Sequence, residues 1–221
     1  MSINPESVQE LLASADFSDR MRGINQLRQL DPGIAFELIQ SVVNDSHVRV
    51  RYAAISQLAS LGTQNPQQSM TILRDRLLNE PEPDVQAAAA DSIGALKLTD
   101  AFPDLEHLYQ TTPEWLVKFS IVAALGELGD LRSLPLLEDA LKSESDLLMT
   151  AAIGSLGELG DVHAVSLLIP LASHPDWQIR HRVAKALGQL GCPDEAREAL
   201  QRLAQDEFEQ VANEAQASLT L

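Results

Sequence analysis

Two glutamates and a glutamine recur at the same place in three similar stretches of the chain. Glu127, Glu158 and Gln189 each precede a Leu-Gly pair, and subtraction of the residue numbers gives 31 residues from each to the next. Carboxylates held at a regular spacing can donate or accept protons, or accept hydrogen bonds from the N–H groups of a ligand. We therefore take Glu127 and Glu158 as candidate catalytic residues. The alternative is that Glu127, Glu158 and Gln189 form a ladder of side chains that is exposed to solvent or that hydrogen-bonds to the next turn.

Basic and aromatic residues recur near the start of the same stretches. Each stretch begins at an anchor position, which is apolar in most copies, such as Val117 and Ile179. In several copies the residue directly after the anchor is basic: Arg51, Lys118 and Arg180. The next residue in these copies carries a ring: Tyr52, Phe119 and His181. A guanidinium fork matches a carboxylate, so the cations suit an acidic ligand group. Bonds to acidic groups across the turns are the alternative for the cations.

The rings suggest a binding groove. Residues two, five, six and nine positions after the anchor should face away from the core of a helical hairpin. Tyr52, Phe119 and His181 would then project into the groove together with Lys185, and His181 is the third candidate for acid–base chemistry. Aromatic rings there can stack on a flat ligand or anchor a partner helix. Chance placement is the alternative for His181.

Two tryptophans share one position in the repeat. Trp115 and Trp177 each lie two residues before an anchor and follow Pro-Glu or Pro-Asp. They are interpreted either as wedges between adjacent turns or as two matched anchors on one rim of the groove. The partner-binding candidates are therefore Arg51, Tyr52, Trp115, Lys118, Phe119, Trp177, Arg180 and Lys185.

The elements that must position these residues repeat along the whole chain. Apolar residues at helical spacing follow each anchor, and a period of 31 to 35 residues, by subtraction, is typical of stacked repeats. We count seven units, with atypical first and last copies as an open stack requires. Their anchors are Asp19, Val50, Val85, Val117, Leu148, Ile179 and Val211.

Shorter amphipathic segments lie between the anchor helices. The sequence predicts them at residues 6–14, 34–43, 67–78, 102–109, 134–141, 164–171 and 195–204. Each unit is then an αα-hairpin, and the fold class is all-α, an α-solenoid of about seven HEAT-like hairpins forming a single domain over residues 1–221.

Glycines recur at two places in the units. Gly129 supplies the permissive backbone that ends a helix, whereas Lys97 replaces the glycine of the third unit. Gly126, Gly157 and Gly188 are interpreted as tight packing of neighbouring helices, or as a shallow floor for a flat ligand.

Composition excludes several classes of protein. With 32 acidic and 16 basic residues the net charge is −16, which argues against nucleic-acid binding. Cys192 is the only cysteine and the histidines have no ligand spacing, so we expect no metal site. No apolar run suits a membrane span or a secretory signal, and no P-loop or Ser-His-Asp order is present. A cytoplasmic location is expected.

The repeat resembles the HEAT-like repeat of phycobilisome lyases. The pattern is a capping acid, an anchor followed by Arg, Lys or Gln, and then A-x-x-x-L-x-x-L-G-D, carried best by residues 117–130, 148–161 and 179–191. The stretches VRVRYAAISQLASLG (48–62) and DWQIRHRVAKALGQLG (176–191) are similar to the cyanobacterial phycobilisome degradation subgroup. No cofactor requirement is implied, and phycocyanobilin is the ligand that the resemblance suggests.

The resemblance implies a protein that binds phycobiliproteins, phycocyanin or allophycocyanin, in association with phycobilisomes. It would detach the bilin from its cysteine, with the E/F-type lyases, which attach the chromophore and usually work with a partner chain, as an alternative. A non-catalytic adaptor is a further alternative, and a helper in cofactor or iron–sulfur assembly is a third, although the lone cysteine argues against cluster ligation. Whether the chain is an enzyme stays open at this point.

Overall fold

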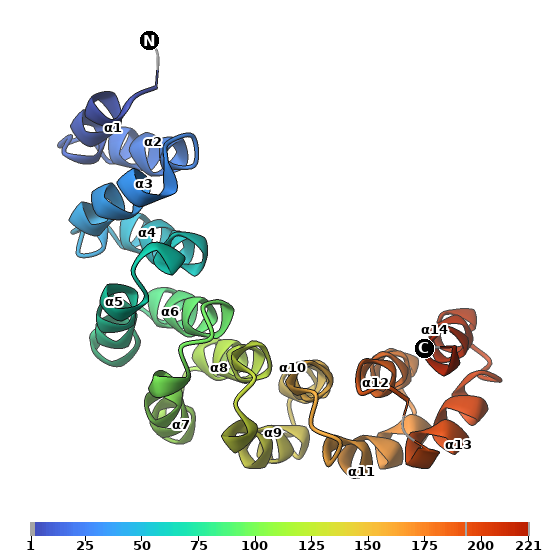
Figure 1. Ribbon diagram of the computed structural model, residues 1–221. Helices are drawn as coiled ribbons and strands as arrows, with labels where there is room; N and C mark the ends of the chain where they lie inside the picture. Colours follow the sequence, from blue (N-terminus) through green and yellow to red (C-terminus); the bar gives the residue numbers. More distant parts are fainter. Residues whose placement is uncertain (1–2, 193, 221) are drawn as a thin grey trace. The chain divides into compact units, whose positions relative to one another are not determined.

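The computed structural model describes residues 3–192 and 194–220, and every regular element in these ranges is a helix (Figure 1). The all-α prediction is therefore confirmed. Each predicted anchor lies in a helix of its own: α2 (Phe17–Leu27), α4 (Val48–Leu61), α6 (Pro83–Ala95), α8 (Trp115–Leu128), α10 (Asp146–Leu159), α12 (Trp177–Gln189) and α14 (Glu209–Leu219).

The segments between the anchor helices are also helical, as predicted. They are α1 (Pro5–Leu12), α3 (Pro32–Ile39), α5 (Pro66–Asn79), α7 (Phe102–Thr111), α9 (Leu134–Leu141), α11 (Ala164–Leu168) and α13 (Asp194–Leu203). Short 3-10 turns extend or introduce several of them: η1 (Gln40–Val42), η2 (Gly62–Gln64), η3 (Thr99–Ala101), η4 (Leu131–Ser133) and η5 (Ile169–Ser173). Proline occupies the first or second position of α1, α3, α5, α6, α7 and α9. It fits there because an N–H group in the first helical turn has no partner within the helix.

The chain forms two compact units, Met1–Ile121 and Val122–Leu221, with the division inside α8. The single domain over residues 1–221 that the sequence predicted stays a prediction. In the first unit α2, α4 and α6 pack in succession, with α1, α3 and α5 behind them. In the second, α10, α12 and α14 pack in succession, with α9 and α13 behind them. Each unit thus has a layer of anchor helices and a second layer.

The core of each unit lies between its two layers. In the first unit Val50, Leu58 and Ile93 are fully buried, and in the second Leu156 and Leu187 are. Val50 is an anchor and the other four lie eight positions after an anchor, as the helical spacing predicted. Burying each such side chain contributes about 1.5–3 kcal/mol relative to exposure, so the apolar stripe of the anchor helices fixes which face is left for function.

The glycines nine positions after an anchor serve helix packing, not an open floor. A Cβ on Gly126 would lie 2.6 Å from the Cα of Ser155, and one on Gly188 would meet the side chain of Ser218. Gly157 faces Ala186 and Gln189 in the same way. The prediction that this position faces the groove is therefore wrong, because the next anchor helix covers it. The alternative interpretation, tight packing of neighbouring helices, is confirmed.

The glycines that end the helices fall into two kinds. Gly129, Gly160 and Gly191 have φ of 69°, 74° and 81°, the left-handed conformation that ends a helix. Gly62 keeps a right-handed φ of −62°, and a Cβ there would lie 2.5 Å from Leu96 Cδ1. Gly62 therefore allows close packing, whereas the other three allow a turn of the backbone.

Lys97 occupies the left-handed position without being a glycine. Its φ is 52°, its N–H bonds to the carbonyl of Gly94, and the N–H of Leu98 bonds to that of Ile93. The helix therefore ends with the same pair of bonds as at Gly191, but with a Cβ in a conformation that costs an L-residue about 1 kcal/mol.

Replacing Lys97 with glycine is expected to raise the free energy of unfolding by about 1 kcal/mol, since the strained Cβ is removed. Gly160→Ala should lower it by a similar amount. Urea unfolding followed by circular dichroism measures both. Lys97→Ala is the control: it keeps the Cβ and should bring no gain, and an equal gain from Lys97→Ala and Lys97→Gly would contradict the explanation.

Candidate functional site

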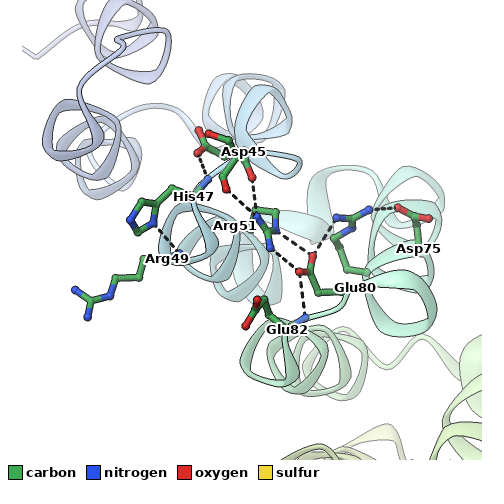
Figure 2. Close-up of polar contacts among 9 residues, drawn as sticks. Asp45, His47, Arg49, Arg51, Asp75, Glu80 and Glu82 are labelled. Atoms are coloured by element: carbon green, nitrogen blue, oxygen red, sulfur yellow. Dashed lines mark hydrogen bonds and ion pairs between the residues drawn. The ribbon is translucent and has the colours of Figure 1, made fainter.

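The arginines that follow the anchors bind carboxylates of the next repeat. Arg51 Nη2 donates to Glu80 Oε1 at 2.6 Å and Nε to Oε2 at 3.1 Å, while Nη1 donates to the carbonyl of Asp45 at 2.8 Å (Figure 2). Arg180 Nε and Nη2 donate to Asp206 at 2.6 and 2.9 Å, and Nη1 to the carbonyl of His174 at 2.8 Å. Both forks are occupied within the fold, which supports the structural interpretation of Arg51 and Arg180 over a ligand-binding one.

These bridges change the acidity of the carboxyl groups. Hydrogen bonds from Arg180 lower the pKa of Asp206. Burial alone raises the pKa of Glu80, whose side chain is fully buried, but the hydrogen bond and charge of Arg51, aided by the charge of Arg76, outweigh it and the pKa is lowered. Both carboxylates therefore stay ionised at neutral pH as parts of the scaffold.

The same carboxylates close the turns before the anchor helices. The residue five positions before each anchor accepts a hydrogen bond through its side chain from the backbone N–H two residues later. The acceptor and donor residues are Ser14 and Asp16, Asp45 and His47, Glu80 and Glu82, Thr112 and Glu114, Ser143 and Ser145, His174 and Asp176, and Asp206 and Phe208. We call these the turn-closing residues.

The type of turn-closing residue depends on which residue follows the anchor of the preceding repeat. Arg20, which the sequence analysis missed, pairs with Asp45 at 2.7 Å, and it too follows an anchor position. An acid closes the turn after each of the units that carry Arg20, Arg51 and Arg180. Residues without a carboxylate close the turns after the units that carry Gln86, Lys118 and Met149, namely Thr112, Ser143 and His174. An arginine after an anchor therefore occurs only where an acidic residue closes the turn of the next repeat.

A groove in the second unit brings several predicted residues together. Trp177, His181 and Lys185 line it from α12, and Leu147 and Thr150 from α10. It has a volume of about 520 Å³, and Asp146, Asp176, Gln178, Ile179, Arg182 and Gln210 complete its lining. His181 and Lys185 are four residues apart on one helix and so share a face. We call this the α10–α12 groove.

Lys185 links the groove to the two candidate glutamates. Partial removal from water raises the pKa of Glu158, the charge of Glu127 raises it further, and the charge of Lys185 opposes both. Glu127 and Glu158 are both exposed on the second unit. The ladder of carboxylates along a groove stays a prediction, although the charge of Glu127 does act on Glu158.

His181 has an acidic neighbour of its own. Its Nε2 lies 3.8 Å from Glu214 Oε2, a residue of α14 that the sequence analysis did not single out. His181 lines the groove, whereas Glu127 and Glu158 are not among the groove residues. The three candidate catalytic residues thus belong to one unit, in which the charge of Lys185 acts on Glu158.

The two tryptophans have different surroundings. Trp177 stacks on Phe208, with ring centroids 5.5 Å apart and planes at 11°. Trp115 is 64% exposed. The stack supports the wedge interpretation for Trp177, which also lines the α10–α12 groove, and Trp115 has no matching stack in the described part of the chain. Phe208 was missed because its partner, Trp177, lies 31 residues away, by subtraction.

The remaining candidates belong to the first unit. Tyr52 is 47% exposed on α4, and Phe119 is half-buried on α8. The ammonium group of Lys118 lies 5.6 Å from the centre of the Tyr109 ring, a cation–π contact that holds it within the fold. The structure does not bring these three residues into one described pocket.

Within residues 3–192 and 194–220, no three His, Cys, Asp or Glu side chains are grouped so that they could hold a metal ion. None of the helices in the same ranges combines the length and apolarity needed to cross a lipid bilayer.

Comparison with known proteins gives the family. The sequence profile of HEAT repeats matches residues 70–152 and 148–220, which together are more than half of the chain. The chain belongs to the HEAT-repeat family. No curated protein matches it in sequence.

Solved HEAT-like structures resemble the fold. A chain of the complex of CpcE and CpcF of phycocyanin lyase from Nostoc is 20% identical, with a TM-score of 0.65 over 100% of this chain and 95% of that one. YibA of Escherichia coli is 15% identical, with a TM-score of 0.66 over 98% and 82%. An engineered protein is 18% identical, with a TM-score of 0.59 over 98% and 67%. These likenesses confirm the α-solenoid prediction.

Removing only the arginine of one bridge is expected to lower the free energy of unfolding more than replacing both the arginine and the carboxylate. Arg180→Gln leaves the Asp206 side chain, 9% exposed, without its counter-charge, so the free energy of unfolding should fall by about 3 kcal/mol. The double variant Arg180→Gln/Asp206→Thr copies the Gln86 and Thr112 combination and should lose clearly less. Urea unfolding measures both, with the exposed Arg182→Gln as control. Equal losses in the single and double variants would contradict the pairing.

The bridge also predicts a pH dependence. The pKa of Asp206 is lower in the folded chain than the value of about 3.9 expected when unfolded. Its stabilisation is therefore fully present above about pH 4 and is lost as the pH falls through the lowered folded pKa. Melting temperatures measured across this range should converge for the native chain and the double variant. A constant difference would exclude Asp206 as the titrating group.

Proposed function

We propose that this HEAT-repeat protein binds phycobiliproteins and acts on their bilin, as a phycobilisome degradation protein of the NblB type that detaches phycocyanobilin from its cysteine. The observation that carries the proposal is the likeness over 100% of the chain to a chain of the CpcE and CpcF complex of phycocyanin lyase. The repeat motifs of residues 117–130, 148–161 and 179–191, which resemble those of phycobilisome lyases, support it.

The α10–α12 groove has the properties that a bilin site needs. Its volume of about 520 Å³ lies within the range of about 300–1,000 Å³ usual for small-molecule sites. Trp177 and Leu147 offer apolar surface to a flat tetrapyrrole. Arg182 and Lys185 line the same groove and can pair with its two propionates, since among the described residues neither has a bridge like that of Arg180.

Detachment needs one proton donor and one proton acceptor. The bond between the cysteine sulfur and the bilin side chain breaks, a neighbouring carbon gives up a proton, and the sulfur receives one, so that no oxidant or reductant is required. Glu158, with its raised pKa, suits the donor, and His181, beside Glu214, suits the acceptor. Glu127 favours the protonated form of Glu158 through its charge.

Two alternatives use the same surface differently. An E/F-type lyase would run the reaction in the direction of attachment, with the same two groups in exchanged roles, and would work with a partner chain. A non-catalytic adaptor is favoured by a separate observation: Glu127 and Glu158 lie outside the groove that His181 lines.

Incubation with phycocyanin and allophycocyanin tests the proposal. The pure protein should lower the visible absorbance of covalently bound chromophore and release free bilin. The triple variant Glu127→Gln/Glu158→Gln/His181→Gln should react at least about a hundredfold more slowly, because general acid–base groups contribute about that much or more. Glu198→Gln, an exposed glutamate of α13 in the other layer, is the control and should react normally.

The outcomes separate the candidates. Stable binding of phycocyanin with no change in its spectrum, by both the native protein and the triple variant, would favour the adaptor. Chromophore gained by apo-phycocyanin in the presence of free phycocyanobilin would favour attachment. Neither binding nor spectral change would overturn the proposal as a whole.

A further inference from the structure

Rings two positions before an anchor stack on a ring of the following repeat where that repeat supplies one. Phe17 stacks on His47 with centroids 4.0 Å apart, and Trp177 stacks on Phe208 at 5.5 Å. Each partner lies three positions before the next anchor. The chain therefore shows twice, once in each unit, what a ring at this position packs against.

Trp115 is the third ring at this position and has no such partner. The following repeat has Ser145 three positions before its anchor, so its sequence offers no ring. Trp115 is 64% exposed, and no ring contact is found for it in the described part of the chain. A large aromatic surface with a known mode of packing is thus left open on the first unit.

The surroundings of Trp115 indicate the charge of the missing partner. Beside Trp115, Glu114 is exposed, as are Glu82 and Asp84 in the preceding turn. The nearby cation, Lys118, is already held over Tyr109. Acidic surroundings and a net charge of −16 favour a basic partner.

We propose that Trp115 is the anchor of a docking site for a segment of a partner protein in which an aromatic residue lies close to an arginine. The partner ring stacks on the exposed face of Trp115, and the arginine meets the exposed carboxylates of Glu114, Glu82 and Asp84. The inference rests on the internal repeats and does not depend on bilin chemistry.

Selection of short random peptides displayed on phage, with the full protein as bait, tests the site. The enriched peptides should carry Phe, Tyr or Trp near Arg. Synthetic copies should bind Trp115→Ala at least about tenfold more weakly than the native protein, the loss expected for a buried interface tryptophan. Trp115→Phe, which keeps a ring, should retain most of the affinity. Ile34→Ala removes another exposed apolar side chain of the same unit, on α3 in the other layer, and should bind normally.

Fluorescence reports on the contact directly. The chain has two tryptophans, so in the Trp177→Phe variant the emission comes from Trp115 alone. The selected peptides should shift or quench it, and raised salt should weaken them. The proposal is overturned if no peptide is enriched, if the enriched peptides lack rings, or if Trp115→Ala binds them as well as the native protein does. It is also overturned if free phycocyanobilin perturbs Trp115 and no peptide does.

Discussion

Every anchor helix starts from a turn that is closed by one side-chain acceptor. Serine, threonine, aspartate, glutamate and histidine all fill this place, and each accepts a hydrogen bond from a backbone N–H two residues later. Free N–H groups at the start of a helix must be satisfied if the helix is to form there. What all these residues share is an acceptor atom at short reach, and this requirement fixes where the repeats begin.

The arginine bridges add a second constraint to the same turns. Arg180 holds the carbonyls before its own helix and the turn-closing Asp206 of the next repeat at once. The start of α12 is thereby fixed from both sides. Because His181 and Lys185 lie within the first three turns of that helix, the bridge sets the face on which the groove is built. The charged residues of the sequence thus divide into two groups: those that hold the scaffold and those left free to meet a ligand.

The helices could be predicted because their signal is local and periodic. Val117, Leu125 and Leu128 lie within one helical stretch, and the period recurs along the chain, so fold class and element order follow from the sequence alone. The exposed face was harder to predict. Gly126 was placed in an open groove by rotation about a single helix, which takes no account of the neighbouring helix that covers it.

Pairs between repeats were harder still to predict from the sequence. Arg180 and Asp206 are 26 residues apart, by subtraction, and their partnership becomes plain only when the repeats are aligned on the turn rather than on the helix. Arg20 escaped notice because the first anchor is Asp19, a polar residue in an otherwise apolar position. Phe208 lacked any signal as a candidate until Trp177 was seen to stack on it. The site therefore followed from the sequence only in part, through the residues of α12.

The joint occurrence of arginine and acid has a consequence for how such a chain can grow or be rearranged. Copying or exchanging whole repeats is the simplest route by which solenoids change length. Here a repeat carrying arginine, moved in front of one that opens with Ser143 or His174, would bring a guanidinium without a counter-ion into a closely packed junction. Recombination within this protein is therefore restricted to breakpoints that keep the arginine and its acidic partner together. A designer who exchanges repeats must choose segments that contain the whole junction between two hairpins, not a single hairpin.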